Sequence, residues 1–190
     1  MRIVAGKHRG RTLIAPKGKG LRPTAGVARE GLFNILIHGR PARAGAQPLA
    51  EARVLEAFAG TGAFAFEALS RCAGSAVLLD TDPKALNAAR ANAEALGERD
   101  NVTLIKADAT RPPSAASAEA AGIAFLDPPY GSGLGARALG ALAAKGWLAK
   151  GALCIVEVAA GEPFTPPDGF EVLEERRFSA ARFVFLRWRK

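Results

Sequence analysis

Short apolar runs alternate with stretches of helical periodicity over most of the chain, and this alternation predicts an α/β fold. The apolar runs predict strands at residues 53–57, 75–80, 102–106, 123–126, 153–158, 170–178 and 182–189. The intervening stretches predict helices at residues 63–72, 83–96 and 134–148. Strands that alternate with helices form parallel sheets with right-handed crossovers. The last two apolar runs have no helix between them, so they predict an antiparallel pair beside a mostly parallel sheet.

The beginning of the chain does not follow this alternation. Residues 2–5 and 11–14 are short β-prone runs on either side of a glycine-containing basic segment, which predicts a hairpin with a basic tip. Prolines and glycines exclude regular structure from residues 15–23. Thr24 fits the N-cap of a helix that continues to about His38.

A linker rich in Pro, Gly and Ala, residues 39–50, predicts two units: an extension (1–43) and a body (44–190). The charge divides at the same place. The extension holds 10 Lys/Arg and one acid, a net charge of +9, whereas the body holds 16 Lys/Arg and 17 acids, a net charge of −1; together they give +8. A basic segment on a nearly neutral body indicates a polyanionic partner. We expect a nucleic acid, because the basic residues lack the spacing of an amphipathic membrane-surface helix.

Composition excludes several other classes. No apolar run approaches the roughly 20 residues that a membrane-spanning helix needs, and the N-terminus lacks the apolar core of a signal peptide. Two cysteines, Cys72 and Cys154, do not make a disulfide framework. With only His8 and His38, the chain offers no pattern for a structural metal site. We therefore expect a cytoplasmic protein without a membrane span or a bound metal.

Carboxylates stand where successive predicted strands end, and ligands of doubly wound sheets bind beyond those ends. Glu56 ends the first strand and precedes a glycine turn (58–62) that departs from G-x-G-x-x-G, which disfavours a nicotinamide oxidoreductase. Asp80 ends the second strand, at the offset where an acid takes ribose hydroxyls. Asp108 follows the third strand, where it could hold an adenine amino group, whereas Asp82 is predicted only to cap the next helix.

The fourth strand ends in Asp127-Pro128-Pro129-Tyr130. The prolines donate no backbone hydrogen bond and have a fixed φ, so they hold their carbonyls, the Asp127 carboxylate and the Tyr130 ring rigidly. Such a strand end can accept the N–H bonds of a planar amine and stack on its ring. Together with the three preceding acids, it favours S-adenosylmethionine as the cofactor and an aromatic amine as the acceptor.

These motifs resemble those of class I S-adenosylmethionine-dependent methyltransferases, in which Asp-Pro-Pro-Tyr is the amino-methylating motif. The extension narrows the resemblance to the RsmD family of bacterial 16S rRNA guanine-N2 methyltransferases. The segments that carry it are Arg2-Ile3-Val4-Ala5-Gly6, Arg9-Gly10-Arg11, Leu21-Arg22-Pro23-Thr24 and Arg29-Glu30-Gly31-Leu32-Phe33-Asn34-Ile35-Leu36. The resemblance implies a Rossmann-like, mostly parallel seven-stranded sheet with an antiparallel C-terminal hairpin. It also implies methylation of a guanine exocyclic amine in 16S rRNA, within a small ribosomal subunit or an assembly intermediate.

The strand ends and the resemblance together assign roles to individual residues. Catalysis is expected of Asp127, Pro128, Pro129 and Tyr130. Cofactor contacts are expected of Arg22, Thr24, Glu56, Phe58, Ala59, Gly60, Thr61, Gly62, Asp80, Thr81, Asp108, Ala109 and Asp127. Phosphate contacts of RNA are expected of Lys7, Arg9, Arg11, Lys17, Lys19 and Arg22. We expect a monomer, and either Asp127 or water to take the proton that the amine loses.

The chain departs from the family pattern at three places. Glu56 stands where the family usually has Asp, Gly26-Val27 stands where it usually has an Asp-Arg pair, and Asp80 stands where it commonly has Glu. The Asp-Pro-Pro-Tyr tip fits adenine N6 as well as guanine N2, so another RNA or DNA amino-methyltransferase remains an alternative. A non-catalytic RNA-binding assembly factor on the same fold is the second alternative.

Overall fold

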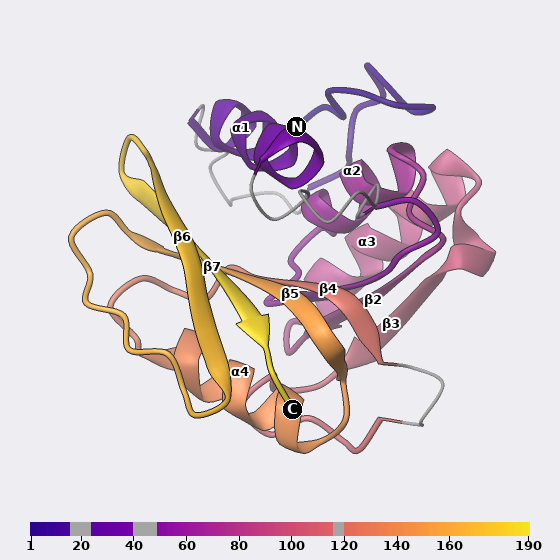
Figure 1. Ribbon diagram of the computed structural model, residues 1–190. Helices are drawn as coiled ribbons and strands as arrows, with labels where there is room; N and C mark the ends of the chain where they lie inside the picture. The colour runs from indigo at the N-terminus through magenta and orange to yellow at the C-terminus, as the bar shows by residue number, and fades with distance from the viewer. Residues whose placement is uncertain (16–23, 40–48, 116–119) are drawn as a thin grey trace.

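The computed structural model describes residues 1–15, 24–39, 49–115 and 120–190 (Figure 1). Its elements follow one another as α1 (Thr24–His38), β1 (Arg53–Ala57), α2 (Ala63–Ser70), β2 (Ser75–Asp80), α3 (Pro83–Leu96), a 3-10 turn η2 (Arg99–Asn101), β3 (Val102–Lys106), β4 (Ala121–Leu126), α4 (Leu134–Ala144), β5 (Leu148–Ala159), β6 (Phe170–Phe178) and β7 (Ala181–Trp188). The seven strands form one sheet in the order β3-β2-β1-β4-β5-β7-β6. Strands β1 to β5 are parallel, and β7 runs antiparallel to both β5 and β6. The predicted fold class is confirmed.

Helix α4 and strand β5 differ from the sequence-based prediction. The helix ends at Ala144 instead of residue 148, because Gly146 takes a left-handed conformation with φ of 78°. The N–H of Trp147 then bonds back to the carbonyl of Leu142 at 3.0 Å. Strand β5 consequently begins at Leu148, five residues earlier than predicted, and its pairing with β4 contains a register irregularity between Ala121 and Ile123.

The predicted N-terminal hairpin is present in a minimal form. Arg2 and Thr12 make one antiparallel bridge. Ile3 donates its N–H to the carbonyl of Arg11 at 3.0 Å, and Leu13 donates to that of Met1 at 2.8 Å. In Figure 1 this indigo hairpin lies over α2 and α3.

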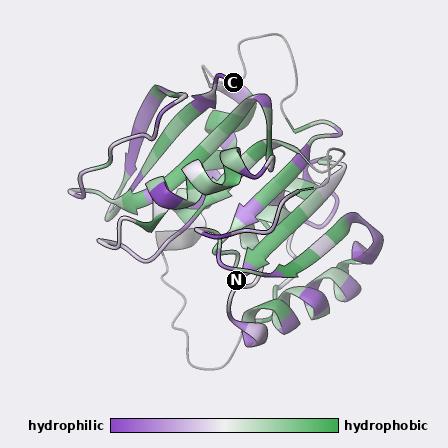
Figure 2. Cartoon of the chain, turned by 90° about the horizontal axis from the view of Figure 1, so that it is seen from below, coloured by the Kyte–Doolittle hydropathy of each residue, from purple (hydrophilic) through white to green (hydrophobic). Residues whose placement is uncertain are grey.

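Alternating side chains give the sheet two apolar faces. Leu55, Val77 and Ala124 belong to the cluster on the α4 side, and their neighbours Val54 and Ala76 belong to the opposite cluster. Helices α1, α2 and α3 cover that second face, whereas α4 covers the first (Figure 1). Figure 2 shows the central strands mostly in the green of hydrophobic residues, with hydrophilic purple on loops and on outer helix surfaces. Because both faces of the sheet are buried, the sequences of these strands are short continuous apolar runs.

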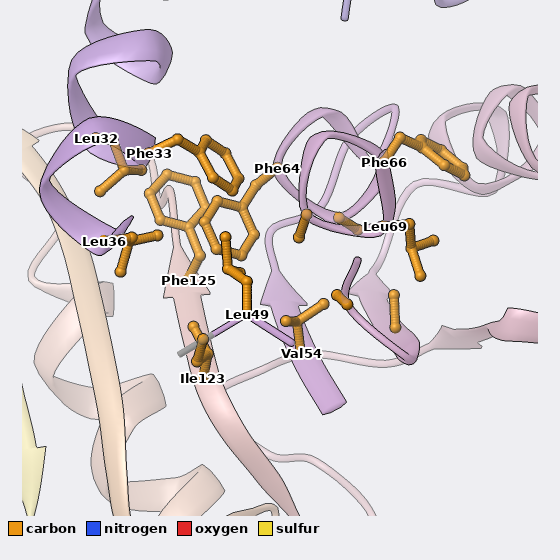
Figure 3. Close-up of a cluster of buried hydrophobic side chains, with 14 of the residues drawn as sticks. Leu32, Phe33, Leu36, Leu49, Val54, Phe64, Phe66, Leu69, Ile123 and Phe125 are labelled. Carbon is orange, nitrogen blue, oxygen red and sulfur yellow. The ribbon is translucent and has the colours of Figure 1, made fainter. Parts of the chain in front are cut away.

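A row of aromatic rings joins the extension to the sheet (Figure 3). Phe33 of α1 stacks on Phe64 of α2 with ring centroids 5.0 Å apart, and Phe64 stacks on Phe125 of β4 at 4.6 Å. Phe125 meets the edge of Phe183 of β7 at 6.2 Å. Helix α1 therefore shares one core with the body. The predicted unit boundary between residues 43 and 44 lies outside the described residues and stays a prediction.

Candidate active site

A cavity of about 560 Å³ opens at the carboxyl ends of the parallel strands. Strand ends, helix α1 and the β6–β7 hairpin enclose it. Four carboxyl groups line it, those of Glu56, Asp80, Asp127 and Glu157, together with one Lys/Arg side chain among the described residues, Arg29. The cavity is therefore acidic in a chain whose net charge is +8. Such a cavity favours a cationic ligand or one that presents N–H donors.

The turn after β1 forms one wall of this cavity. Phe58, Gly60 and Gly62 all have positive φ, of 57°, 55° and 79°. At Gly62 a Cβ would lie 2.6 Å from a methyl of Leu78, so only glycine lets the turn pack this closely on β2. Asp80 accepts the N–H of Gly60 at 2.7 Å, so this predicted ligand also holds the turn in place.

Glu56 lines the cavity and is almost fully buried. Its two oxygens accept the N–H groups of Phe64 at 3.2 Å and Ala65 at 2.9 Å, at the N-terminus of α2. Burial raises the pKa of Glu56 to about 8, against the lowering effect of the two N–H bonds; the nearby charge of Asp127 adds to the rise. The side chain that the sequence predicted for the cofactor therefore also caps the N-terminus of α2.

The tip predicted for catalysis lies at the cavity wall. Asp127 is exposed, Pro128 is buried, and Tyr130 is half-buried. Tyr130 donates its hydroxyl proton to the Glu157 carboxylate at 2.6 Å. Glu157 was not among the predicted site residues. Its position at the end of the apolar run of β5 carried the same strand-end signal as the other acids, but only the strand order shows that β5 lies next to β4.

Arg29 is the second site residue that the sequence-based assignment missed. It lies on α1, only 8% exposed, and donates to the carbonyl of Arg2 at 2.8 Å. Burial lowers the pKa of Arg29, while the charges of Glu67 and Glu56 oppose that change. Neither periodicity nor spacing shows that α1 folds over the strand ends, so this residue could not be placed from the sequence.

The other predicted cofactor residues fall into two groups, those that line the cavity and those that do not. Phe58, Ala59, Gly60 and Thr61 line the cavity, whereas Gly62, Thr81, Asp108 and Ala109 are not among its lining residues. Asp108 is exposed, and the N–H and hydroxyl of Thr110 lower the pKa of its carboxyl. Thr24 begins α1, and Arg22 lies outside the described residues. Asp82 caps α3 by accepting the N–H of Lys84 at 2.8 Å, as predicted.

The basic hairpin tip lies away from the cavity. Lys7 donates its N–H to the carbonyl of Ser70, the last residue of α2, and pairs with Glu98 beyond the end of α3 at 2.7 Å. Arg11 donates to the carbonyl of Ala95 at 2.7 Å. Both helices begin at the cavity side of the sheet, and the eight residues of α2 span about 12 Å. The predicted phosphate contacts Lys17, Lys19 and Arg22 lie outside the described residues.

Within the described residues, no group of three or more His, Cys, Asp or Glu side chains is arranged to hold a metal ion. None of the described helices has the length and apolar character to cross a membrane.

Solved structures share this fold. The Escherichia coli protein yhhF superposes with a TM-score of 0.81 at 30% identity, covering 100% of this chain and 98% of that chain. An RNA methyltransferase from Salinibacter ruber, solved in complex with S-adenosyl-L-homocysteine, gives a TM-score of 0.61 at 13% identity and covers 90% of this chain and 94% of that chain. The strand order and these neighbours define a Rossmann-like class I methyltransferase fold.

The family model described as conserved hypothetical protein 95 matches residues 1–187. The Escherichia coli protein named ribosomal RNA small subunit methyltransferase D is 37% identical over 175 residues, which cover 87% of this chain and 79% of that protein. This chain belongs to that family, the RsmD family, and the resemblance drawn from its motifs is confirmed.

Proposed function

We propose that this protein transfers a methyl group from S-adenosylmethionine to the exocyclic N2 amine of a guanine in the RNA of the small ribosomal subunit. One observation carries the proposal. The Asp127-Pro128-Pro129-Tyr130 tip, to which we assign the acceptor amine, lines the same cavity as the glycine turn and Asp80, to which we assign the nucleoside of the cofactor. The name of the Escherichia coli relative supports ribosomal RNA as the substrate class.

The cavity residues fit S-adenosylmethionine. The Asp80 carboxylate suits ribose hydroxyls, and the N–H of Gly60, in the turn after β1, holds this carboxylate at the cavity wall. Glu56 and Asp127 suit the positive charges of the methionine end, and the Arg29 guanidinium suits its carboxylate. When bound, this donor supplies an electrophilic methyl on a sulfonium, so the protein's main task is to prepare the acceptor.

A guanine amine is a poor nucleophile because its lone pair is delocalised into the ring. Hydrogen bonds from the amine to the Asp127 carboxylate and to the Pro128 carbonyl would favour a pyramidal nitrogen with its lone pair directed at the donor. Tyr130, held by Glu157, would stack on the base and fix its plane. Positioning of this kind and electrostatic complementarity supply most of the rate enhancement that we ascribe to the site. The proton leaves to Asp127 or to water.

The target base must leave its stack to reach this cavity, which costs a few kcal/mol. The acidic cavity repels phosphate, so the basic extension has to supply the attraction to RNA. We expect the enzyme to be a cytoplasmic monomer. Its substrate should be an assembled subunit or an assembly intermediate, since the extension is too small to select one guanine alone. The phosphate contacts would make binding sensitive to salt.

An Asp127→Asn variant tests the proposal. We expect methyl transfer to small-subunit RNA to fall by roughly 10²–10³-fold, because the carboxylate acceptor of the amine is lost. Binding of S-adenosylmethionine, measured by calorimetry, should change only a few-fold, and Asp168→Asn, at an exposed loop position, is the matched control.

Labelled methyl transfer should be measured on free RNA, on intact subunits and on DNA, followed by nuclease mapping of the modified base. A label on adenine or DNA would contradict the proposal, as would full activity of the Asp127 variant. Absence of cofactor heat and of transfer from the wild-type protein would favour a non-catalytic RNA-binding role.

A further inference from the structure

Glu157 and Asp127 form a pair of carboxylates on one face of the sheet. Strands β4 and β5 are parallel, with Leu126 opposite Val156. Strand β4 ends at Leu126, and continuing its register by one residue brings Asp127 opposite Glu157, on strands about 4.8 Å apart. Both residues line the large cavity, on the face opposite to Leu126 and Val156, whose side chains pack on the α4 side.

Tyr130 fixes the Glu157 carboxylate. Its hydroxyl donates to Oε1 of Glu157 at 2.6 Å, although the two residues are 27 positions apart. Both residues also line a second cavity of about 140 Å³, and Pro128 and Pro129 likewise line both cavities. The Glu157–Tyr130 pair therefore forms part of the partition between the two cavities, beside the tip where we place the acceptor amine.

The two purines differ next to their exocyclic amines. Guanine carries an N1–H donor beside its N2 amine, whereas adenine carries an N1 acceptor beside its N6 amine. A carboxylate accepts the guanine N1–H, but it repels the adenine N1 lone pair. A pair of adjacent carboxylates is thus complementary to the N1–H and N2–H edge of guanine and to no edge of adenine.

We propose that Glu157 is a specificity-determining residue that accepts the N1–H of guanine while Asp127 holds the N2 amine. This inference rests on the proposed function, and it supplies the base discrimination that the Asp-Pro-Pro-Tyr tip lacks by itself. A carboxylate has about four acceptor positions, so the bond from Tyr130 and a bond from the base are compatible. The Tyr130 bond sets the carboxylate's orientation before the base enters.

The test compares guanine with 2-aminopurine, which keeps the N2 amine but has an acceptor at N1. Each base is placed at the mapped target position of small-subunit RNA by splinted ligation, and the RNA is assayed both free and reassembled with subunit proteins. Single-turnover methyl transfer is measured for wild type, Glu157→Gln and Tyr130→Phe. Cofactor affinity and melting temperature show whether each variant keeps its fold.

We expect wild type to prefer guanine, and Glu157→Gln to reduce the guanine to 2-aminopurine rate ratio by roughly 10-fold or more, because a charged acceptor is replaced by a group that can also donate. Tyr130→Phe should slow both bases and lower the ratio by less than Glu157→Gln does, since it keeps the carboxylate and loses only the bond that orients it. An unchanged ratio in Glu157→Gln, including an equal loss on both bases, would overturn the inference and leave Glu157 as a support for Tyr130. Failure of wild type on guanine RNA would overturn the proposed function itself.

Discussion

Val4 donates its backbone N–H to Oε2 of Glu67 at 2.9 Å, across 63 residues of sequence. The other oxygen, Oε1, accepts the N–H of Ala5 at 3.1 Å and the Nε–H of Arg71 at 2.9 Å. Glu67 is only 1% exposed, so these bonds form in a largely dry environment. One buried carboxylate thus fixes the first strand of the hairpin to helix α2, beside the core that Phe33 shares with Phe64.

Substitution of Glu67 should destabilise the whole chain. Glu67→Ala leaves two backbone N–H groups and a largely buried arginine without their acceptor, so we expect a loss of about 3–5 kcal/mol in the free energy of unfolding. Glu67→Gln keeps one acceptor oxygen and should lose roughly 1–3 kcal/mol. Denaturant unfolding followed by circular dichroism measures both, with Glu94→Ala, on the exposed side of α3, as a control expected to stay within about 0.5 kcal/mol. A separate early transition of the extension, with the body unaffected, would contradict a shared core.

The pH dependence of stability should identify Glu56. Its pKa is about 8 in the folded protein against an ordinary value of 4.5, so between these pH values the folded state binds more protons than the unfolded state. Stability attributable to this residue is therefore fully present below about pH 4.5 and is lost as pH rises to about 8, by roughly 3–5 kcal/mol. Glu56→Gln should remove this slope from the curve of unfolding free energy against pH. A slope as steep in the variant as in wild type would assign the effect to other groups.

Binding of the cationic cofactor should ionise the same carboxyl. At pH 7 the free protein carries Glu56 mostly protonated, since its pKa is about 8. A ligand with positive charge favours the carboxylate, so binding should release up to about one proton and become tighter as pH rises towards 8. Calorimetry in buffers of different ionisation enthalpy measures the proton, and Glu56→Gln should abolish its release. Proton uptake, or release that persists in the variant, would contradict this assignment.

The local signals in the sequence were sufficient for much of the fold and part of the site. The apolar runs predicted the bounds of β1, β2 and β3 as they are observed. The carboxyl ends of parallel strands lie at the same edge of a sheet, so Asp80 and Asp127 were expected at one site, and both line the cavity. Helix α4 was overextended because a left-handed Gly146 looks the same in sequence as a helical glycine.

The missed residues depend on tertiary packing. Arg29 reaches the cavity only because α1 folds over the strand ends, and Glu157 reaches it only because β5 pairs with β4. The basic hairpin tip is held by Ser70 and Glu98, which are 62 or more residues away in sequence. The net charge of the extension therefore predicted a basic segment but not where its tip lies. Long-range hydrogen bonds of this kind leave no periodic pattern.

Arg9 should contribute more to RNA binding than its neighbours in the hairpin. Arg9 is exposed and makes no ion pair with the described residues, whereas Lys7 is paired with Glu98 and Arg11 bonds to Ala95. If the tip contacts phosphate, Arg9→Ala should weaken RNA binding and reduce the slope of log K against log salt by about 1. Filter binding across a salt series measures this, with Lys150→Ala, at an exposed position at the start of β5, as the control. An unchanged slope in Arg9→Ala would contradict this prediction and place the hairpin tip outside the RNA interface.

Gly135 of α4 packs closely against Val156 of β5 and near Pro128 of the proposed catalytic tip. A Cβ at this position would lie 2.8 Å from Cγ1 of Val156 and 3.4 Å from Cγ of Pro128, so Gly135→Ala requires the Val156 side chain or helix α4 to move. We expect a loss of about 1–3 kcal/mol in stability and a lower kcat, because Pro128 carries a carbonyl that we place against the acceptor amine. Gly140→Ala on the same helix is the matched control, since its Cβ would meet Pro167 at an ordinary 3.8 Å. That control should gain about 0.5–1 kcal/mol from helix propensity and keep the wild-type kcat. Equal stability and equal methyl-transfer rates in both variants would show that the tip does not depend on close packing against α4.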